Sequence, residues 1–351
     1  SDTECSITFA QVYDIARNTG AYLVEKLGVD RTPVAVFAGR KMVTPAYFLG
    51  VVYAGRPYAP IDASLPDKRI EKILENLCPR AIVADRESLE HVESIVDELV
   101  KSEGFDRPQI FIAEDISRFE QVACADSNCK ISESAGDAVT DSENDMLATV
   151  RRQMSMTDPL YIIYTSGSTG NPKGVMTSHL SLMTYINAYC DVMHIEESDV
   201  LGNQSPLDYI AAIRDIYLPL KTGCSTAIIP KEYFMEPNAL FDYMNDKKVS
   251  SVGWSVSAFT ILTSLGAFEE VGLKSLRKIC FSGSVMPCSV LRKWQENLPE
   301  AHFVNQYGPT EATASCTYYS VDHTVVDDEV LPIGKAYDNY RVFLIDEHGN
   351  E

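Results

Sequence analysis

The chain has 351 residues, 45% of them apolar, which is enough for two domains or two tightly joined subdomains with sizeable cores. Its net charge of −20 repels nucleic acid and anionic lipid surfaces, so we expect neither as a partner. Apolar runs long enough to span a membrane are absent, and the acidic start lacks the features of a signal peptide, so we expect a cytoplasmic protein.

The nine cysteines are scattered without CxxC spacing, and several lie in apolar surroundings. This pattern favours reduced, mostly buried thiols over a disulfide framework. Cys124 and Cys129 lie in an acidic segment with no histidine nearby, which argues against a zinc site there.

The first half of the chain alternates between helical and extended patterns. Thr8 is placed to cap an amphipathic helix over residues 8–24, and a second helix is predicted at 47–55, ending at Gly55. Runs rich in β-branched residues predict strands at residues 33–38, 59–62, 79–85 and 109–113. Such alternation is typical of an α/β fold, a mostly parallel sheet with helices on both faces.

Residues 114–150 are rich in Asp, Glu and Ser with few large apolar groups, which predicts a poorly ordered surface segment. The pattern resumes after it, with a helix at 180–193 and strands at 160–164, 276–282 and 302–305. No internal repeat is visible.

Residues 164–175 read Tyr-Thr-Ser-Gly-Ser-Thr-Gly-Asn-Pro-Lys-Gly-Val, a composition suited to binding phosphate. Glycines let backbone N–H groups approach an oxyanion, Thr165, Ser166 and Thr169 add hydroxyl donors, and Lys173 adds a positive charge. A buried strand at 160–164 would deliver this loop at its carboxyl end, where open α/β sheets bind ligands. Lys173 is not followed by Ser or Thr, so this is not a Walker loop. The alternative is a Gly/Ser-rich surface turn.

A second loop at 305–313 offers an aromatic face (Tyr307), a hydroxyl (Thr310) and a carboxylate (Glu311). A carboxylate beside phosphates usually recruits Mg²⁺, because the like charges would otherwise repel. A solvated glutamate at a helix start would explain Glu311 equally well.

Together the two loops resemble the ANL superfamily of adenylate-forming enzymes, which includes acyl- and aryl-CoA synthetases and nonribosomal peptide synthetase adenylation domains. The likeness runs nearly end to end and is strongest to the amino-acid adenylation branch, notably D-alanine–carrier protein ligases. Further matching motifs lie at residues 53–62, 203–206, 215–217, 282–287 and 331–335.

The resemblance implies the large N-terminal core of an acetyl-CoA synthetase-like fold, with two stacked sheet-and-helix subdomains. The first is expected over roughly 45–200 and the second over 1–44 and 201–330, with the start of a small β-barrel at 331–351. The family continues through a mobile lid carrying a catalytic lysine, and we expect no counterpart of that lid within residues 1–351. We therefore expect this chain to bind nucleotide weakly and to adenylate poorly or not at all.

The resemblance also implies ATP and Mg²⁺ as cofactors, a small carboxylic acid as substrate, and a monomeric protein. The acid would attack ATP to give acyl-AMP and pyrophosphate, and a thiol of a phosphopantetheinyl carrier protein or of CoA would then take the acyl group. An acyl- or aryl-CoA synthetase and a non-catalytic nucleotide-binding relative are the alternatives.

Each functional role is carried over onto a matching position. Thr165, Lys173, Thr310 and Glu311 would be catalytic, with Thr310 on the α-phosphate and Glu311 on the metal. Tyr307 would stack on adenine. The nucleotide-binding positions are Thr165, Ser166, Gly167, Ser168, Thr169, Gly170, Lys173, Gly283, Ser284, Asn305, Gln306, Tyr307, Gly308 and Thr310.

The chain departs from the family where peptide synthetases hold the substrate's α-ammonium with an aspartate. A gapless register places Ile210 there, and a buried ammonium without a charge partner would cost about 3–5 kcal/mol. In a strand, Asp208 would share a face with Ile210 and could compensate. Both registers remain open.

The same register places further side chains along the acyl pocket: Ala211, Arg214, Trp254, Cys280, Ser282, Gln306, Ala314 and Ser315. Arg214 is unusual, because a guanidinium in this pocket suggests a second carboxylate or another acidic group on the substrate. The alternative is an arginine on a helix surface paired with an acidic neighbour.

Overall fold

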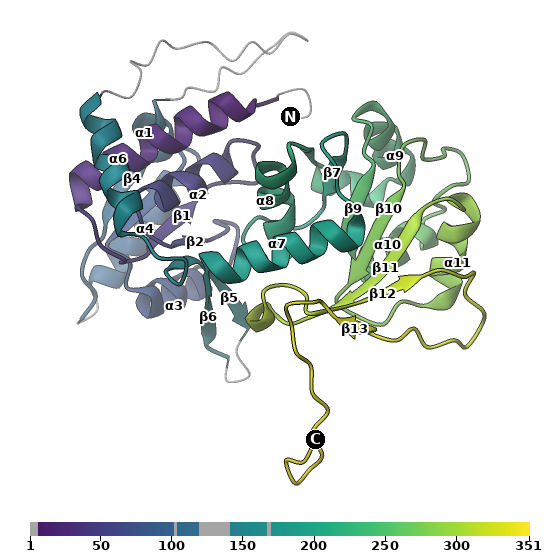
Figure 1. Ribbon diagram of the computed structural model, residues 1–351. Coiled ribbons are helices and arrows are strands. Elements are labelled where there is room, and N and C mark those ends of the chain that lie inside the picture. Colours follow the sequence, from purple (N-terminus) through teal and green to yellow (C-terminus); the bar gives the residue numbers. More distant parts are fainter. Residues whose placement is uncertain (1–5, 102–103, 119–140, 167–169) are drawn as a thin grey trace. The chain divides into compact units, whose positions relative to one another are not determined.

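The computed structural model describes residues 6–101, 104–118, 141–166 and 170–351, and these divide into two compact units. The first unit comprises Ser1–Leu180 and Pro206–Tyr209, and the second comprises Ser181–Ser205 and Ile210–Glu351. Cys124, Cys129, Gly167, Ser168 and Thr169 lie outside the described residues, so the predictions for them stay predictions. Figure 1 shows the chain coloured along its sequence.

The described part of the first unit contains a six-stranded sheet. In spatial order the strands are β4 (Gln109–Ile112), β3 (Ala81–Ala84), β1 (Val34–Phe37), β2 (Tyr58–Pro60), β5 (Pro159–Ser166) and β6 (Pro172–Ser178). All neighbours pair in parallel except β5 and β6, which form an antiparallel hairpin. Every residue of β1 and β3 is buried, which explains their uninterrupted apolar sequences.

Helices surround this sheet. They are α1 (Phe9–Leu27), α2 (Thr44–Tyr53), α3 (Asp67–Leu77), α4 (Leu89–Val100), α5 (Ala113–Ser117) and α6 (Asp141–Gln153). The predicted cap of α1 is confirmed, since the Thr8 hydroxyl accepts a hydrogen bond from the Gln11 backbone N–H, and the Gln11 side-chain oxygen accepts one from the Thr8 backbone N–H.

The N-terminal segment packs within the first unit, not the second. Gly50 of α2 lies so close to α1 that an added Cβ would stand 2.5 Å from the Thr19 side chain. Strand β1 lies between β3 and β2 in the first sheet. Residues 1–44 were expected with the second subdomain, but the described residues among them, 6–44, belong to the first unit.

Residues 114–117 and 141–150 of the acidic segment belong to helices α5 and α6, in contrast to the poorly ordered segment that was predicted. Helix α6 buries Leu147 and Val150, which lie three residues apart on one helix face. Val150 packs against Gly55, because a Cβ added at Gly55 would lie 2.7 Å from the Val150 side chain. Two apolar residues at helical spacing were enough to anchor this helix despite its polar composition.

The described part of the second unit holds a seven-stranded sheet. In spatial order the strands are β13 (Lys335–Ala336), β12 (Thr317–Val321), β11 (His302–Tyr307), β10 (Lys278–Ser282), β9 (Ser251–Ser255), β7 (Val200–Asn203) and β8 (Ser225–Ile228). Strands β11, β10, β9, β7 and β8 pair in parallel with their neighbours. Strands β12 and β13 extend the sheet beyond β11 in antiparallel pairing. The α/β class predicted from the sequence is confirmed.

The remaining helices belong mainly to this unit, although α7 begins in the first. They are α7 (His179–Met193), α8 (Ala212–Thr222), α9 (Pro237–Asp246), α10 (Val256–Ser264) and α11 (Cys288–Asn297), with short 3₁₀ turns η2 (Lys231–Met235) and η3 (Thr310–Ala312). Among the described helices, none has the length and apolar character needed to cross a bilayer.

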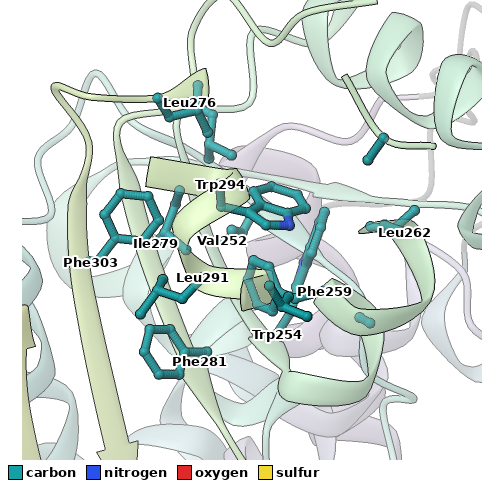
Figure 2. Packing of buried hydrophobic residues seen from close by; sticks show 14 of the residues in the cluster. Val252, Trp254, Phe259, Leu262, Leu276, Ile279, Phe281, Leu291, Trp294 and Phe303 are labelled. Carbon is teal, nitrogen blue, oxygen red and sulfur yellow. The ribbon is translucent and has the colours of Figure 1, made fainter. Parts of the chain in front are cut away.

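The two faces of the second sheet differ in composition. One face carries Trp254, Phe281 and Phe303, which pack with Phe259 of α10 and Trp294 of α11 in an aromatic core (Figure 2). The rings of Phe259 and Trp294 meet edge to face with centroids 4.8 Å apart, a favoured aromatic geometry.

The opposite face is more polar, and we call it the polar face. Strand register places Gly253 of β9, Cys280 of β10 and Val304 of β11 side by side on it. Gln306 follows two residues after Val304 and therefore points the same way. Tyr318 of β12 lies directly opposite Gln306.

Residues 331–351 form little regular structure beyond the two-residue strand β13. The side chains of residues 342–345 are at least half exposed. The start of a β-barrel expected in this segment stays a prediction.

Candidate functional site

The glycine- and hydroxyl-rich loop belongs to the first unit, where it connects the paired strands β5 and β6. In the hairpin register, Thr165 lies directly opposite Lys173, and Ser166 lies opposite Pro172. Directly opposite residues project on the same side of a sheet, so the Thr165 hydroxyl and the Lys173 ammonium share one face of the hairpin. Lys173 and Ser166 are exposed and available to a ligand.

The sequence did not reveal that this loop closes a hairpin. Pro-Lys-Gly at the start of β6 lacks the apolar alternation of a strand, so the residues after the loop gave no strand signal. The bend is accommodated by Gly170, whose φ of +77° lies in the left-handed region.

The hairpin is tied to α3 by two side-chain hydrogen bonds. The Tyr164 hydroxyl donates to Asn76 over 2.9 Å, and Lys72 donates to Asn171 over 3.1 Å. Burial raises the pKa of Tyr164 to about 12, so its hydroxyl stays a donor at neutral pH. These contacts fix the base of the loop on a rigid helix.

The second loop follows β11 in the second unit and turns tightly. Gly308 lies so close to the returning chain that an added Cβ would stand 2.5 Å from the Ser315 Cα. Thr313 and Ala314 both adopt left-handed φ values, 56° and 72°, which is strained for residues with side chains. Such strain is characteristic of functional loops.

Several of the residues predicted to bind nucleotide lie just past the carboxyl ends of neighbouring strands in the second sheet. Strands β10 and β11 are parallel neighbours, so the segments after their carboxyl ends emerge side by side. Gly283 and Ser284 follow β10 and are exposed, while Tyr307 ends β11 with its ring half exposed. Glu311 is exposed in η3. The Asn305 side-chain amide, in contrast, donates a hydrogen bond to the Pro332 carbonyl oxygen over 2.9 Å.

The predicted acyl-pocket residues are only partly brought together. Cys280, Ser282 and Gln306 lie on the polar face, as a shared pocket requires. Trp254 lies on the other face, 1% exposed in the aromatic core, and its indole donates to the Gly202 carbonyl over 2.8 Å. We leave Trp254 out of the proposed pocket, because Gly253 occupies the equivalent place on the polar face.

Asp208 does not lie in a strand, so the expected alternation with Ile210 does not apply. Residues 207–211 form turns that lead into α8. Ile210 is buried, and Ala211 is partly buried just before the first turn of α8. The strand interpretation failed because this short segment bridges β7 and a helix.

Arg214 is buried on the inner side of α8, with 3% of the residue exposed. The interpretation of Arg214 as an arginine on a helix surface is therefore wrong. Its guanidinium lies against Gly253, where an added Cβ would approach Cζ and Nε to 2.4 Å. It also faces the Tyr189 ring, with 5.8 Å between Cζ and the ring centroid. A side chain of any size on β9 at this position would displace the guanidinium.

The Arg214 guanidinium carries its charge throughout the accessible pH range. Burial disfavours that charge, but Tyr189 and the Asp215 carboxylate outweigh it, and the pKa of Arg214 is raised. Burial raises the pKa of the nearby Cys280 thiol to about 11, so it is protonated and unreactive at neutral pH.

The other buried side chains around Arg214 gave no clear signal in the sequence. Tyr185 and Tyr189 of α7 and Tyr337 are buried around Arg214, and burial raises the pKa of each. The one usable hint was Gly253, because a glycine inside a strand often marks the close approach of another group.

The hydroxyl and lysine side chains of the hairpin, and the aromatic and acidic side chains that follow β11, are groups that bind nucleotides in α/β proteins. Residues 1–351 match the AMP-binding enzyme family, and the chain belongs to that family.

Curated relatives are similar over nearly the whole chain. A D-alanine–D-alanyl carrier protein ligase of Bacillus velezensis is 28% identical over 351 residues, and one of Bacillus cereus is 29% identical over 348 residues. Each alignment covers 99% of this chain and 62% of the relative, so the chain spans less than two thirds of those proteins.

Solved structures share the fold. The Vibrio cholerae adenylation domain AlmE, in complex with glycyl-adenosine-5′-phosphate, superposes with a TM-score of 0.77 at 21% identity, covering 99% of this chain and 62% of AlmE. The nonribosomal peptide synthetase FmoA3, with α-methyl-L-serine-AMP bound, gives 0.78 at 20% identity, covering 98% of this chain and 34% of the synthetase.

Proposed function

We propose that this chain is the nucleotide- and acid-binding part of an ATP-dependent ligase that activates a carboxylic acid as acyl-AMP. An oxygen of the acid attacks the α-phosphorus of ATP, and the bond from that phosphorus to the bridging oxygen breaks and releases pyrophosphate. The observation that carries the proposal is membership of the AMP-binding enzyme family over residues 1–351. The opposed Thr165 and Lys173 support it, because they offer a hydroxyl and a charge to phosphate oxygens.

The proposed roles need no covalent intermediate on the protein. Lys173 and Thr165 hold and neutralise the β- and γ-phosphates, and Thr310 donates to the α-phosphate. Catalysis of this kind is mainly alignment and charge neutralisation, where each well-placed donor contributes a few kcal/mol. The half-exposed Tyr307 ring offers a stacking surface for adenine, with the backbone at Gly283 and Ser284 beside it.

A single magnesium ion fits the available ligand at Glu311. The described residues contain no group of three or more His, Cys, Asp or Glu side chains able to enclose a metal. Mg²⁺ is commonly held by one carboxylate together with phosphate oxygens and water, so the exposed Glu311 suits it. When bound, the ion would neutralise phosphate charge.

The acceptor of the acyl group in the whole protein is proposed to be the thiol of a carrier protein. This follows from similarity to ligases named for their carrier protein, and from synthetases of the same fold. CoA is the alternative acceptor, and parallel assays with holo-carrier protein and CoA would separate them.

The test is ATP–pyrophosphate exchange by the whole protein with a panel of amino, keto, hydroxy and aryl acids, combined with calorimetric binding of ATP to this chain with and without Mg²⁺. Lys173→Met and Glu311→Gln should each lower acid-dependent exchange at least tenfold, and only Glu311→Gln should abolish the magnesium dependence of ATP binding. The exposed Lys68→Met and Glu300→Gln are matched controls and should leave both measurements unchanged. A chain that binds no ATP would overturn the proposal.

A further inference from the structure

The buried cluster around Arg214 holds more polar hydrogen-bonding capacity than its neighbours use. Within the described residues, Arg214 Nε and Nη2 are buried without a hydrogen-bond partner. The same holds for both amide atoms of Gln306 and for the Tyr337 hydroxyl. Buried polar atoms are normally paired with protein, water or a ligand, so a group of them without protein partners is a candidate site for a polar ligand.

The free edge of Arg214 has the shape that recognises a carboxylate. The N–H bonds of Nε and Nη2 point in parallel along one side of the guanidinium, which is the geometry of a bidentate pair with two oxygens. Asp215 is the adjacent anion, but its Oδ1 lies 3.5 Å from Nε, and its Oδ2 already accepts from Asn203 over 2.9 Å. Asp215 therefore balances part of the charge without filling the edge.

The cluster belongs to a single surface of the second unit. Arg214 lies over Gly253, next to Cys280, and Gln306 projects from the same face of the sheet. Tyr318, opposite Gln306, stacks on Tyr337 with centroids 5.1 Å apart, which holds the Tyr337 ring at this face. Donors from helix α8, from strand β11 and from the segment at Tyr337 are thus buried on the polar face.

The polar face also leads from this cluster to the proposed adenylate loops. Ser282 follows Cys280 on the same face and is partly exposed, and the chain then leaves the sheet at the exposed Gly283. Two residues along a strand span about 6–7 Å, roughly the length of a short dicarboxylic acid.

We propose that the activated acid carries a second carboxylate, which binds Arg214 in bidentate fashion with Gln306 and Tyr337 beside it. The substrate class is a short dicarboxylic acid, or a derivative that retains the second acid group. In the gapless register the buried apolar Ile210 offers no anion to an α-ammonium, so that register predicts no favourable contact for a free α-amine there. This inference rests on the proposed function and specifies its substrate.

The test uses stable analogues in which an acyl group is joined to 5′-O-sulfamoyladenosine, with binding to this chain measured by calorimetry. Glutaryl, glutaramyl and pentanoyl derivatives have the same five-carbon length and end in a carboxylate, a carboxamide and a methyl group. The glutaryl compound should bind at least tenfold tighter than either of the others. Arg214→Gln should erase that preference, Arg214→Lys should restore part of it, and neither should change affinity for unacylated sulfamoyladenosine.

Each other outcome has a definite meaning. Equal or reversed ranking of the glutaryl and pentanoyl compounds, while sulfamoyladenosine binds, overturns the inference and leaves the proposed function standing. A carboxamide as good as the carboxylate also overturns it, because a neutral polar group would then suffice. If sulfamoyladenosine itself fails to bind, the proposed function falls as well. The ranking with the unaltered chain decides the matter even if an Arg214 variant does not fold.

Discussion

The Arg214 guanidinium packs directly against the backbone of Gly253. A Cβ added at residue 253 would lie only 2.4 Å from Arg214 Cζ. Gly253→Ala should therefore push the guanidinium out of its position without removing its charge. We expect a loss of stability of about 1–3 kcal/mol, typical of overpacking, together with loss of the carboxylate preference. Chemical denaturation and calorimetry with the glutaryl analogue would measure both.

Gly272→Ala is the matched control, because an added Cβ there meets nothing within 4 Å and its φ is not in the left-handed region. This variant should keep both the stability and the preference. Should Gly253→Ala bind the glutaryl compound as the unaltered chain does, the Arg214 edge has no part in recognition.

A second prediction concerns the base of the phosphate hairpin. Gly174 is paired opposite Tyr164, and an added Cβ would lie 2.9 Å from Ile162 and 3.1 Å from the Tyr164 ring. Gly174→Ala should displace that ring, break its hydrogen bond to Asn76, and destabilise the first unit by about 1–3 kcal/mol.

Tyr164→Phe separates packing from hydrogen bonding, because it keeps the ring and loses only the hydroxyl bond to Asn76. Its cost should be about 1 kcal/mol. In a double-mutant cycle the two changes should be clearly less than additive. Full additivity would mean that the Gly174 effect does not act through Tyr164.

What the sequence could predict was set by local patterns. Strands β1 and β3 were recognisable because parallel strands buried on both faces are continuously apolar, and the α1 cap because Thr8 stands just before apolar residues at helical spacing. Both conclusions depend on near neighbours in the chain alone.

What the sequence could not predict depends on residues far apart in the chain. The face on which Trp254 lies is set by its register with β10, and the burial of Arg214 by the absent side chain at Gly253. Helix α6 was missed because its sequence is mostly polar, although Leu147 and Val150 are buried. Family resemblance supplied candidate pocket positions, but the strand register decided which of them share a face.

Asp199 anchors a buried ionic network in the second unit. It accepts from Lys278 over 2.6 Å, from Arg277 over 2.8 Å and from Ser250 over 2.6 Å. Burial alone would raise its pKa, but hydrogen bonds from Lys278, Ser250 and the Glu196 backbone outweigh burial, and the pKa of Asp199 lies below its ordinary value of 3.8.

Because the folded-state pKa is lowered, this group stabilises the fold above the unfolded value and stops doing so as the pH falls through the folded value. Asp199→Asn should cost about 3–5 kcal/mol at neutral pH, since it leaves Lys278 buried without its charge partner. The variant should also lose less stability as the pH falls from neutral to below 3.8, the ordinary pKa of the carboxyl group. Urea unfolding across that range gives both quantities.

The exposed Asp246 supplies the control for that experiment, as its contact with Lys247 is 3.4 Å long and largely solvated. Asp246→Asn should change stability by less than about 1 kcal/mol and keep the original pH dependence. An Asp199→Asn variant with an unaltered acid profile would show that other carboxylates govern acid unfolding.

The last prediction concerns strain in the loop that carries Glu311. Ala314 has a φ of 72° and no side-chain hydrogen bond to compensate, whereas Ala312 lies in the regular turn η3. Ala314→Gly should relieve the strain and raise stability by up to about 1 kcal/mol, although glycine's greater freedom in the unfolded chain offsets part of the gain. Ala312→Gly should lower stability by about 0.5–1 kcal/mol, because glycine there brings only that entropic cost. Thermal unfolding of both variants tests this difference in sign. If both variants lose stability equally, the left-handed conformation at residue 314 stores no strain, and the tight turn at Gly308 alone shapes the loop.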